Sequence, residues 1–227
     1  MEQSSIYDKL LQLPLFQGHS RGDLTDIMTK IKVDFRSFNK GQIIAKQDDP
    51  CRHIVFLIEG EVQLTRTSLH KDLIFVEPFS APAAFGIDTV FGLRQSFSHT
   101  ITAHSDVRTL VLSKQNLADH MFAHEVFRYN MLNLMSTRIQ RSNSLLWAPD
   151  EGDTLHRFVA MLKRNFLYLG GHKEILGGMV SLAKMTGETR LRISQILNTL
   201  EQQGLIILSR KRIIIPRLEA ILQSTQP

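Results

Sequence analysis

Residues 123–147 constrain the fold more than any other stretch of the sequence. They contain neither Gly nor Pro, and apolar residues recur among them at the spacing of one helix face. The pattern predicts a helix of roughly 24 residues, about 36 Å long at 1.5 Å per residue. A helix this long is unusual in a globular domain, and its apolar stripe must face either a partner helix or the rest of the chain.

A partner helix from a second copy of the chain is the interpretation we follow, so we expect a homodimer. The interface prediction takes in the apolar stripe of the helix: Phe127, Met131, Leu134, Met135 and Ile139. Packing of the same stripe against the chain's own strands is the alternative, and both can hold at different turns. Residues 148–152 follow the helix with Pro, Asp and Gly, which indicates a hinge. Residues 123–149 are therefore predicted to form the dimerisation helix and hinge.

The sequence before this helix has a different texture. Residues 5–30 indicate short helices, and residues 32–112 alternate short apolar runs with turn residues. The expected strands contain residues 43–44, 54–58, 62–64, 73–76, 101 and 107–112. Several short strands at this spacing predict a sandwich or small barrel. We expect residues 1–122 to form one domain.

Residues 150–227 are predicted to form a second, helical domain. Its first helix has Asp153 or Thr154 as cap and buries Phe158 and Leu162, among others. A short connection follows, in which two Gly-Gly pairs bracket residues 174–176. A short helix over 181–185, a turn at Thr186-Gly187 and a second helix from Thr189 to about residue 203 then give a helix-turn-helix pattern.

The second helix of this pattern has two contrasting faces. At 100° per residue one face is apolar, and it is expected to bury Ile193, Ile196, Leu197 and Leu200. The opposite face carries Leu191, Gln195, Asn198 and Gln202, and it suits the major groove of DNA. Apolar strands at 205–208 and 213–215 flank a basic loop at 209–212, which predicts a β-hairpin wing able to contact phosphates.

The charge distribution supports a polyanionic partner. Residues 154–217 contain 11 Lys and Arg against 3 Asp and Glu, whereas the formal charge of the whole chain is +5. Double-stranded DNA is therefore the expected partner. The predicted DNA-contacting residues come from the second helix and the wing: Thr189, Arg190, Leu191, Arg192, Ser194, Gln195, Asn198, Arg210, Lys211 and Arg212.

Other function classes find little support in the residues. The sequence has no apolar run of about 18 residues and no signal peptide pattern at its start, so we expect a cytoplasmic protein without membrane contact. The single cysteine, Cys51, excludes an internal disulfide. No metal-ligand or nucleophile motif is visible, so we expect no enzyme activity and no metal site. A cupin-like β-barrel enzyme and a sensor module that regulates a partner protein remain the alternatives.

The ordered set of patterns resembles the CRP/FNR family of transcription regulators. Residues 38–44 (FNKGQII) are similar to the family's first β-roll strand and its turn glycine, and residues 55–62 (VFLIEGEV) to its strand–Gly–strand signature. The resemblance implies an α+β fold: an N-terminal double-stranded β-helix (a jelly-roll-like β-roll), a long dimerisation helix and a C-terminal winged helix-turn-helix. It also implies a homodimer on a palindromic operator, with RNA polymerase as a further partner.

The resemblance also locates an effector pocket, where this chain departs from the family. Cyclic-AMP-binding members carry a Glu and an Arg that hold the ribose and the cyclic phosphate; Ile87 and Phe97 stand at these positions here. Neither side chain can donate to a phosphate, so we expect no cyclic-AMP binding. The pocket residues carried over are Gly86, Ile87, Phe97, Ser98 and His99 from the roll, and Ser142 and Asn143 from the long helix.

The effector itself stays open at this point, and the cofactor is unknown. The pocket could bind another molecule, apolar or haem; it could be filled by its own side chains; or the protein could sense through Cys51 or a histidine. Nine histidines, including His99, His104, His120 and His124, keep haem among the alternatives.

The resemblance further predicts base contacts. Arg190 matches the family's first base-contacting Arg, which pairs with guanine. Leu191 replaces a Glu and Gln195 replaces an Arg at the next two family positions. Because Leu can pack on a thymine methyl and Gln pairs with adenine, the half-site should keep one guanine and be richer in A·T than that of the family's prototype.

Overall fold

The computed structural model describes residues 6–31, 33–147 and 153–224. Its contacts divide the chain into two compact units. The first consists of Met1–Gln63 and Phe79–Gln140, and the second of Leu64–Pro78 and Arg141–Pro227. The chain therefore passes between the units three times. The division into 1–122, 123–149 and 150–227 remains a functional proposal; the compact units differ from it in grouping residues 64–78 with the C-terminal part.

The first unit begins with the short helices expected before the strands: α1 (Ile6–Leu11), a 3₁₀ turn at Pro14–Phe16 and α2 (Arg21–Lys30). Ser20 defines the start of α2, because its hydroxyl accepts the N–H of Asp23 while the Asp23 carboxylate accepts the N–H of Ser20. This reciprocal pair satisfies two backbone donors that the helix itself leaves without partners.

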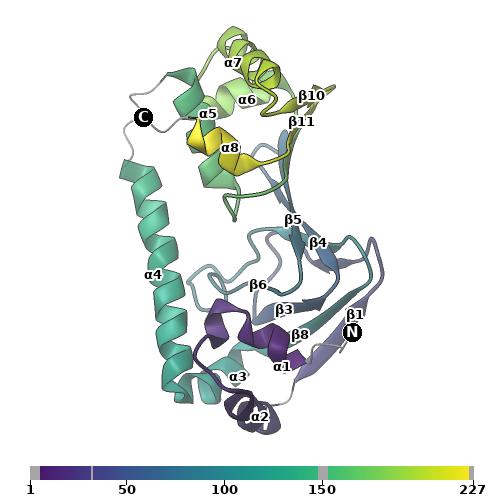
Figure 1. The fold of residues 1–227 in the computed structure, drawn as a ribbon, viewed down its shortest axis with the longest axis vertical. Coiled ribbons are helices and arrows are strands. Elements are labelled where there is room, and N and C mark those ends of the chain that lie inside the picture. Colours follow the sequence, from purple (N-terminus) through teal and green to yellow (C-terminus); the bar gives the residue numbers. More distant parts are fainter. Residues whose placement is uncertain (1–5, 32, 148–152, 225–227) are drawn as a thin grey trace. The chain divides into compact units, whose positions relative to one another are not determined.

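Antiparallel strands form the body of the first unit (Figure 1). Four of them make one sheet in the order β1-β8-β3-β6: β1 (Asp34–Phe38), β8 (Val107–Ser113), β3 (His53–Glu59) and β6 (Ala83–Phe85). β2 (Ile43–Ala45) pairs with β7 (Thr100–Ala103). Five consecutive residues of β3 are buried, which explains why it appears in the sequence as a continuous apolar run.

The long helix predicted at 123–147 is α4 (Glu125–Trp147), reached through α3 (Lys114–Asp119) and a 3₁₀ turn at Met121–Ala123. Phe127 and Met131 are buried within the first unit, where the Phe127 ring lies 5.8 Å from that of Phe16. Leu134 and Met135 are half-buried. The self-packing alternative thus holds for the first turns of the stripe, and of its five residues only Ile139 is exposed.

The second unit contains the C-terminal helices and a small sheet. Its elements are β4 (Glu61–Thr67, from Leu64 on), β5 (Leu73–Ser80, up to Pro78), α5 (Thr154–Asn165), β9 (Lys173–Gly177), α6 (Met179–Thr186), α7 (Arg190–Gln202), β10 (Ile207–Ser209), β11 (Arg212–Ile215) and α8 (Leu218–Gln223). The strand order is β10-β11-β9-β5-β4. Asp153 caps α5, as expected, by accepting the N–H of His156.

The expectation of a mere connection at residues 174–176 is wrong. These residues belong to β9, which pairs with β11 on one side and with β5 on the other. Ile175 lies opposite both Ile213 and Phe75. The strand is too short, and too closely bracketed by glycines, for its own pattern to reveal it; only its two neighbours define it.

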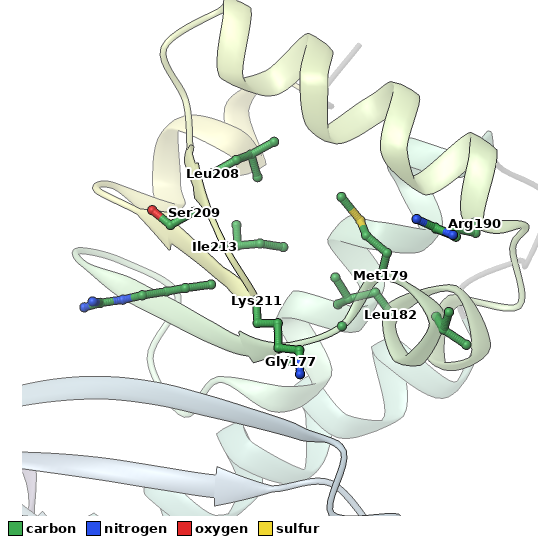
Figure 2. Close-up of a pocket in the computed structure, with 11 residues that line it drawn as sticks. Gly177, Met179, Leu182, Arg190, Leu208, Ser209, Lys211 and Ile213 are labelled. Atoms are coloured by element: carbon green, nitrogen blue, oxygen red, sulfur yellow. The ribbon is translucent and has the colours of Figure 1, made fainter.

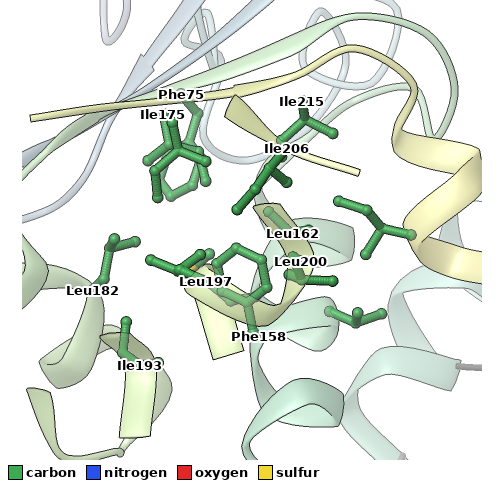
Figure 3. Close-up of a cluster of buried hydrophobic side chains, with 14 of the residues drawn as sticks. Phe75, Phe158, Leu162, Ile175, Leu182, Ile193, Leu197, Leu200, Ile206 and Ile215 are labelled. Carbon is green, nitrogen blue, oxygen red and sulfur yellow. The ribbon is translucent and has the colours of Figure 1, made fainter. Parts of the chain in front are cut away.

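One apolar core fills the second unit (Figure 3). Leu73 and Phe75 of β5 belong to this core together with residues of α5, α7, β9 and β11. The fully or nearly fully buried members labelled in Figure 3 beside Phe75 include Phe158, Leu162, Ile175, Ile193, Leu197, Leu200 and Ile215. The segment 64–78 is therefore a structural part of this unit, although it lies among the β-roll strands in the sequence.

No helix within the described ranges has both the length and the apolar composition needed to cross a membrane.

Candidate functional site

The helix pair α6 and α7 has the turn that the sequence predicts. Gly187 ends α6 in the left-handed conformation, with φ of 68°, which suits a residue without a Cβ. The buried Thr186 hydroxyl donates to the carbonyl of Leu182 at 2.9 Å. Thr189 caps α7 by accepting the N–H of Arg192 at 3.3 Å. The turn is thus fixed at both ends by local hydrogen bonds.

The two faces of α7 separate as expected. Ile193, Leu197 and Leu200 are buried against the rest of the unit. Leu191 is 69% exposed, and Gln195 and Asn198 are also exposed on the outer face. Thr189, Arg190 and Arg192 are exposed near the helix start, whereas Ser194 is half-buried. The helix therefore offers a row of polar and apolar groups that contacts nothing in its own core.

The hairpin of β10 and β11, here called the wing, carries the predicted basic residues with one difference. Arg210 and Lys211 form its turn, where Lys211 adopts a positive φ of 57° and its carbonyl accepts the N–H of Gly177 at 2.9 Å. Arg212 belongs to β11 rather than to the loop. It forms an ion pair with Glu174 at 2.7 Å, which raises the pKa of the guanidinium and lowers that of the Glu174 carboxyl. Within the described residues, the positive charge of the wing that is not held in an ion pair thus lies on Arg210 and Lys211.

A pocket of about 380 Å³ lies between the start of α7, the start of α6 and the wing (Figure 2). Arg190 and Lys211 line it from two different elements, and Met179, Leu182 and Ile213 supply apolar lining. Cationic groups over an apolar floor fit a sugar-phosphate backbone, whose phosphates are anionic and whose sugars are largely apolar.

Glu188 is the acidic residue closest in sequence to this surface. Its side chain is 3% exposed and accepts from Arg157 at 3.3 Å and from Arg192 at 3.5 Å. Because its carboxylate is covered by two guanidinium groups, it does not present a free negative charge beside α7. The Arg192 side chain remains 64% exposed despite this pair.

The effector region of the β-roll has a closed geometry. Gly86 has φ of 85°, and a Cβ at this position would lie 3.0 Å from Cys51 Sγ and 3.3 Å from Phe97 Cε1. Ile87 and Phe97 are each 4% exposed, and the Phe97 ring packs edge-on against His53 at 5.6 Å. The residues that replace the family's ligand-binding pair are therefore part of the roll's packed interior.

The polar groups of this region are engaged with neighbours. Burial raises the pKa of the Cys51 thiol and lowers the pKa of the His53 imidazole. A protonated, buried thiol is a poor nucleophile, which counts against redox sensing by Cys51. Arg94, the remaining cation near the loop, forms an ion pair with Asp48 at 2.9 Å.

The remaining effector-pocket residues are distributed over both units. Ser98 is exposed and its hydroxyl lies 2.8 Å from His99 Nδ1. Ser142 and Asn143 are exposed on the part of α4 that belongs to the second unit. An ion pair between Asp88 and Arg138, at 3.0 Å, ties the loop after β6 to α4, and no pattern in the sequence indicates it. In the described residues, no group of three His, Cys, Asp or Glu side chains is arranged to hold a metal ion.

Comparisons with known proteins agree with this architecture. Residues 35–124 match the family described as the cyclic nucleotide-binding domain. A protein named global nitrogen regulator from a Synechocystis species is 23% identical over 194 residues, which cover 82% of this chain and 86% of that protein. The catabolite activator protein of Thermus thermophilus superposes with a TM-score of 0.52 at 17% identity, over 93% of this chain and 97% of that one.

A domain-level match points the same way. The N-terminal domain of a transcriptional regulator from Streptomyces coelicolor superposes with a TM-score of 0.50 at 19% identity, covering 64% of this chain and all of that domain. The expected fold class, a β-roll followed by a long helix and a helical C-terminal part, is thereby confirmed.

Proposed function

We propose, since the chain belongs to the CRP/FNR family of regulators, that it binds double-stranded DNA sequence-specifically through α7 and the wing. The observation that carries the proposal is the outer face of α7, where Leu191, Gln195 and Asn198 are exposed beside the cationic pocket of Arg190 and Lys211. Base edges would meet the start of this helix, and phosphates would meet the wing. The relatives found are regulators, which fits a protein without catalytic activity.

The effector region favours a regulator that does not respond to cyclic AMP. The positions that would hold ribose and phosphate are occupied by Ile87 and Phe97, and both side chains are buried. A cyclic nucleotide would have to displace packed apolar groups, and the nearby guanidinium groups of Arg94 and Arg138 are already paired with Asp48 and Asp88. A phosphate left without a partner there would cost several kcal/mol. Of the three alternatives for this pocket, filling by the protein's own side chains is the one the geometry supports best.

A homodimer on a palindromic operator completes the proposal, with a revised interface. Because Phe127 and Met131 are buried in their own unit, the free apolar face of α4 consists of Tyr129, Leu132 and Ile139, all more than half exposed. These positions, spaced by three and seven residues, form the stripe that a second α4 would cover. Two copies would then read half-sites about 34–36 Å apart, one helical turn of DNA.

Light scattering tests the interface. Leu132→Asp combined with Ile139→Asp should convert the dimer to a monomer, whereas Thr137→Asp on the exposed surface of the same helix should leave the dimer intact. A wild-type protein that is monomeric at micromolar concentration would contradict this part of the proposal.

Selection of bound duplexes from a random pool tests DNA binding. We expect enrichment of a two-fold symmetric sequence, whether or not cell extract is present. Its half-site should keep one guanine and be richer in A·T than the half-site of the family's prototype. Binding without sequence enrichment would reduce the function to non-specific DNA binding. Enrichment only with extract would show that a small molecule is required and that the pocket is not closed.

A further inference from the structure

The segment that follows α5 is held more firmly than a connecting loop requires. Phe166, Leu167 and Tyr168 lead from the helix towards β9, and Phe166 is buried in the core of the second unit. Their backbone groups are bound by side chains from two distant parts of the chain, Glu77 and Arg141. Both side chains belong to the same compact unit as α5.

Glu77, on β5, accepts two backbone N–H groups of this segment. Its Oε2 accepts from Leu167 at 2.9 Å and its Oε1 accepts from Tyr168 at 2.8 Å. The same Oε1 lies 3.1 Å from the Nζ of Lys173 on β9. Both side chains of this ion pair are only 2% exposed.

The aromatic rings of the segment enclose the Lys173 ammonium group. Its Nζ lies 5.9 Å from the centre of the Phe166 ring and 5.7 Å from that of Tyr168. Cation–π attraction at such distances adds to the ion pair once the groups are shielded from water. The carboxylate and the ammonium of this pair are therefore both compensated, as burial demands.

Arg141, in the C-terminal part of α4, binds the carbonyl groups of the same region. Its guanidinium donates to Leu167 at 2.7 Å, to Phe166 at 2.9 Å and to Lys163 at 3.1 Å. The Lys163 carbonyl lies in the last turn of α5, and those of Phe166 and Leu167 directly follow the helix. The last carbonyls of an α-helix have no internal partner, and a cation is favoured there. The three residues Glu77, Lys173 and Arg141 are called the clamp below.

We infer that the clamp couples the β-roll to the DNA-binding surface, with Glu77 and Arg141 as positioning residues. Each lies within a few residues of a point where the chain passes between the units, entering the first unit at 78–79 near Glu77 and leaving it at 140–141 beside Arg141. Any shift of the β-roll strands or of α4 is therefore applied directly to Phe166–Leu167–Tyr168. This inference rests on the proposed DNA binding and adds the route by which that binding is regulated.

The route continues from the clamp to the wing through the sheet. Lys173 is the first residue of β9, and β9 pairs with β11, whose partner β10 completes the wing. Phe75 of β5 and Leu197 of α7 belong to the same core. A change at Glu77 thus reaches both the wing and α7 through backbone pairing and close packing, without contacting DNA itself.

The test uses the full-length protein with Glu77→Gln and Lys173→Met, and duplexes selected by the wild type from a random pool. Glutamine keeps the size of Glu77 but loses the charge and one acceptor; methionine keeps the apolar stem of Lys173. We expect amide hydrogen exchange at Leu167 and Tyr168 to accelerate about tenfold in Glu77→Gln. The affinity of both variants for the selected duplex should fall about fivefold, which is within the usual range of coupling between sites.

A merely structural role is excluded by two readouts. The slope of affinity against salt should stay at its wild-type value, because the clamp neutralises no phosphate. Ile221→Ala, which removes buried volume from α8 in the same core, should lower stability while leaving the affinity within about twofold.

Three outcomes would overturn the inference: unchanged exchange at Leu167 and Tyr168, faster exchange with affinity within about twofold of wild type, or an equal loss of affinity in Ile221→Ala. If the wild type selects no duplex at all, the proposed function itself fails. A wild type that selects duplexes while the variants bind them equally well contradicts the coupling alone.

Discussion

The outer face of α7 and the effector region of the β-roll differ in how they use apolar residues. Leu191 is 69% exposed at the start of α7, although burial would stabilise it, whereas Phe97 in the roll is 4% exposed. The side chains on the outer face of α7 do not pack against the core of their own unit. Ile87 and Phe97, at the positions where the family resemblance expects a ligand site, are instead part of the roll's packed interior. Exposed apolar surface is thus retained on the face that we propose binds DNA, whereas the positions compared with the family's ligand site are filled.

The contrast between the two regions predicts opposite responses to truncation. Phe97→Ala should lower the free energy of unfolding by about 3–5 kcal/mol, because it opens a cavity in a packed interior. Leu191→Ala should change it by less than about 0.5 kcal/mol. Urea unfolding measures both, and a Phe97→Ala variant as stable as the wild type would show that the roll has an open pocket after all.

The second expected effect is on base recognition. Gln195→Ala should cost about 1–3 kcal/mol on the preferred duplex and little on random DNA, because the amide is expected to pair with an adenine edge. Gln203→Ala, at the exposed residue that directly follows α7, is the matched control. Competition binding distinguishes the two, and equal losses on specific and random DNA would mean that the assigned face of α7 is wrong.

The wing should affect all sequences alike. Lys211→Ala is expected to weaken binding to specific and random duplexes similarly and to lower the slope of affinity against salt by about one ion. Arg36→Ala, an exposed arginine of the first unit, should leave the slope unchanged. Titrations at several salt concentrations provide the measurement, and a sequence-dependent loss for Lys211→Ala would move this residue from phosphates to bases.

A smaller effect is expected from the ion pair that anchors the wing. The pKa of Glu174 is lowered by Arg212, so the contribution of this ion pair to stability is present at neutral pH and is lost as the pH falls through the depressed pKa. Glu174→Gln should therefore cost about 0.5–1 kcal/mol at pH 7 and less at pH 3. If Glu174→Gln lowers stability equally at both pH values, the effect comes from packing rather than from charge.

Cyclic nucleotides should have no effect at all. Calorimetry with cyclic AMP and with cyclic GMP should give no binding heat, since Phe97 and Ile87 leave neither space nor charge for them. Micromolar affinity for either would break the contrast between the two regions. A Soret band in the visible absorption spectrum would also contradict this contrast, because it would show that haem is bound.

The sequence predicted those parts of the fold that depend on local patterns. The strands around β3, the length of α4, the Thr189 cap and the buried face of α7 all follow from spacing within a few residues. The apolar stripe of α4 was visible as well, but periodicity shows only that a face is apolar, and the packing of Phe127 against Phe16 decides what covers it.

The long-range contacts were beyond such reasoning. β9 is a strand because it pairs with β5 and β11. Glu77 accepts a hydrogen bond from Tyr168, which lies 91 positions away in the sequence. Arg212 looked like a loop residue because its pairing with Glu174 depends on strand register. For the candidate site, residue types indicated the chemistry, whereas exposure and pairing decided which side chains remain available.

The contribution of Leu73 and Phe75 to the core around α7 limits how this protein can be rebuilt. A fragment that starts at Thr154 would contain both helices and the wing, but it would lack two buried side chains and the strand that pairs with β9. Chimaeras that exchange C-terminal halves between regulators would inherit the same defect. In this chain the compact unit that contains α7 and the wing is discontinuous in sequence. A fragment that transfers this unit to another protein must include residues 64–78.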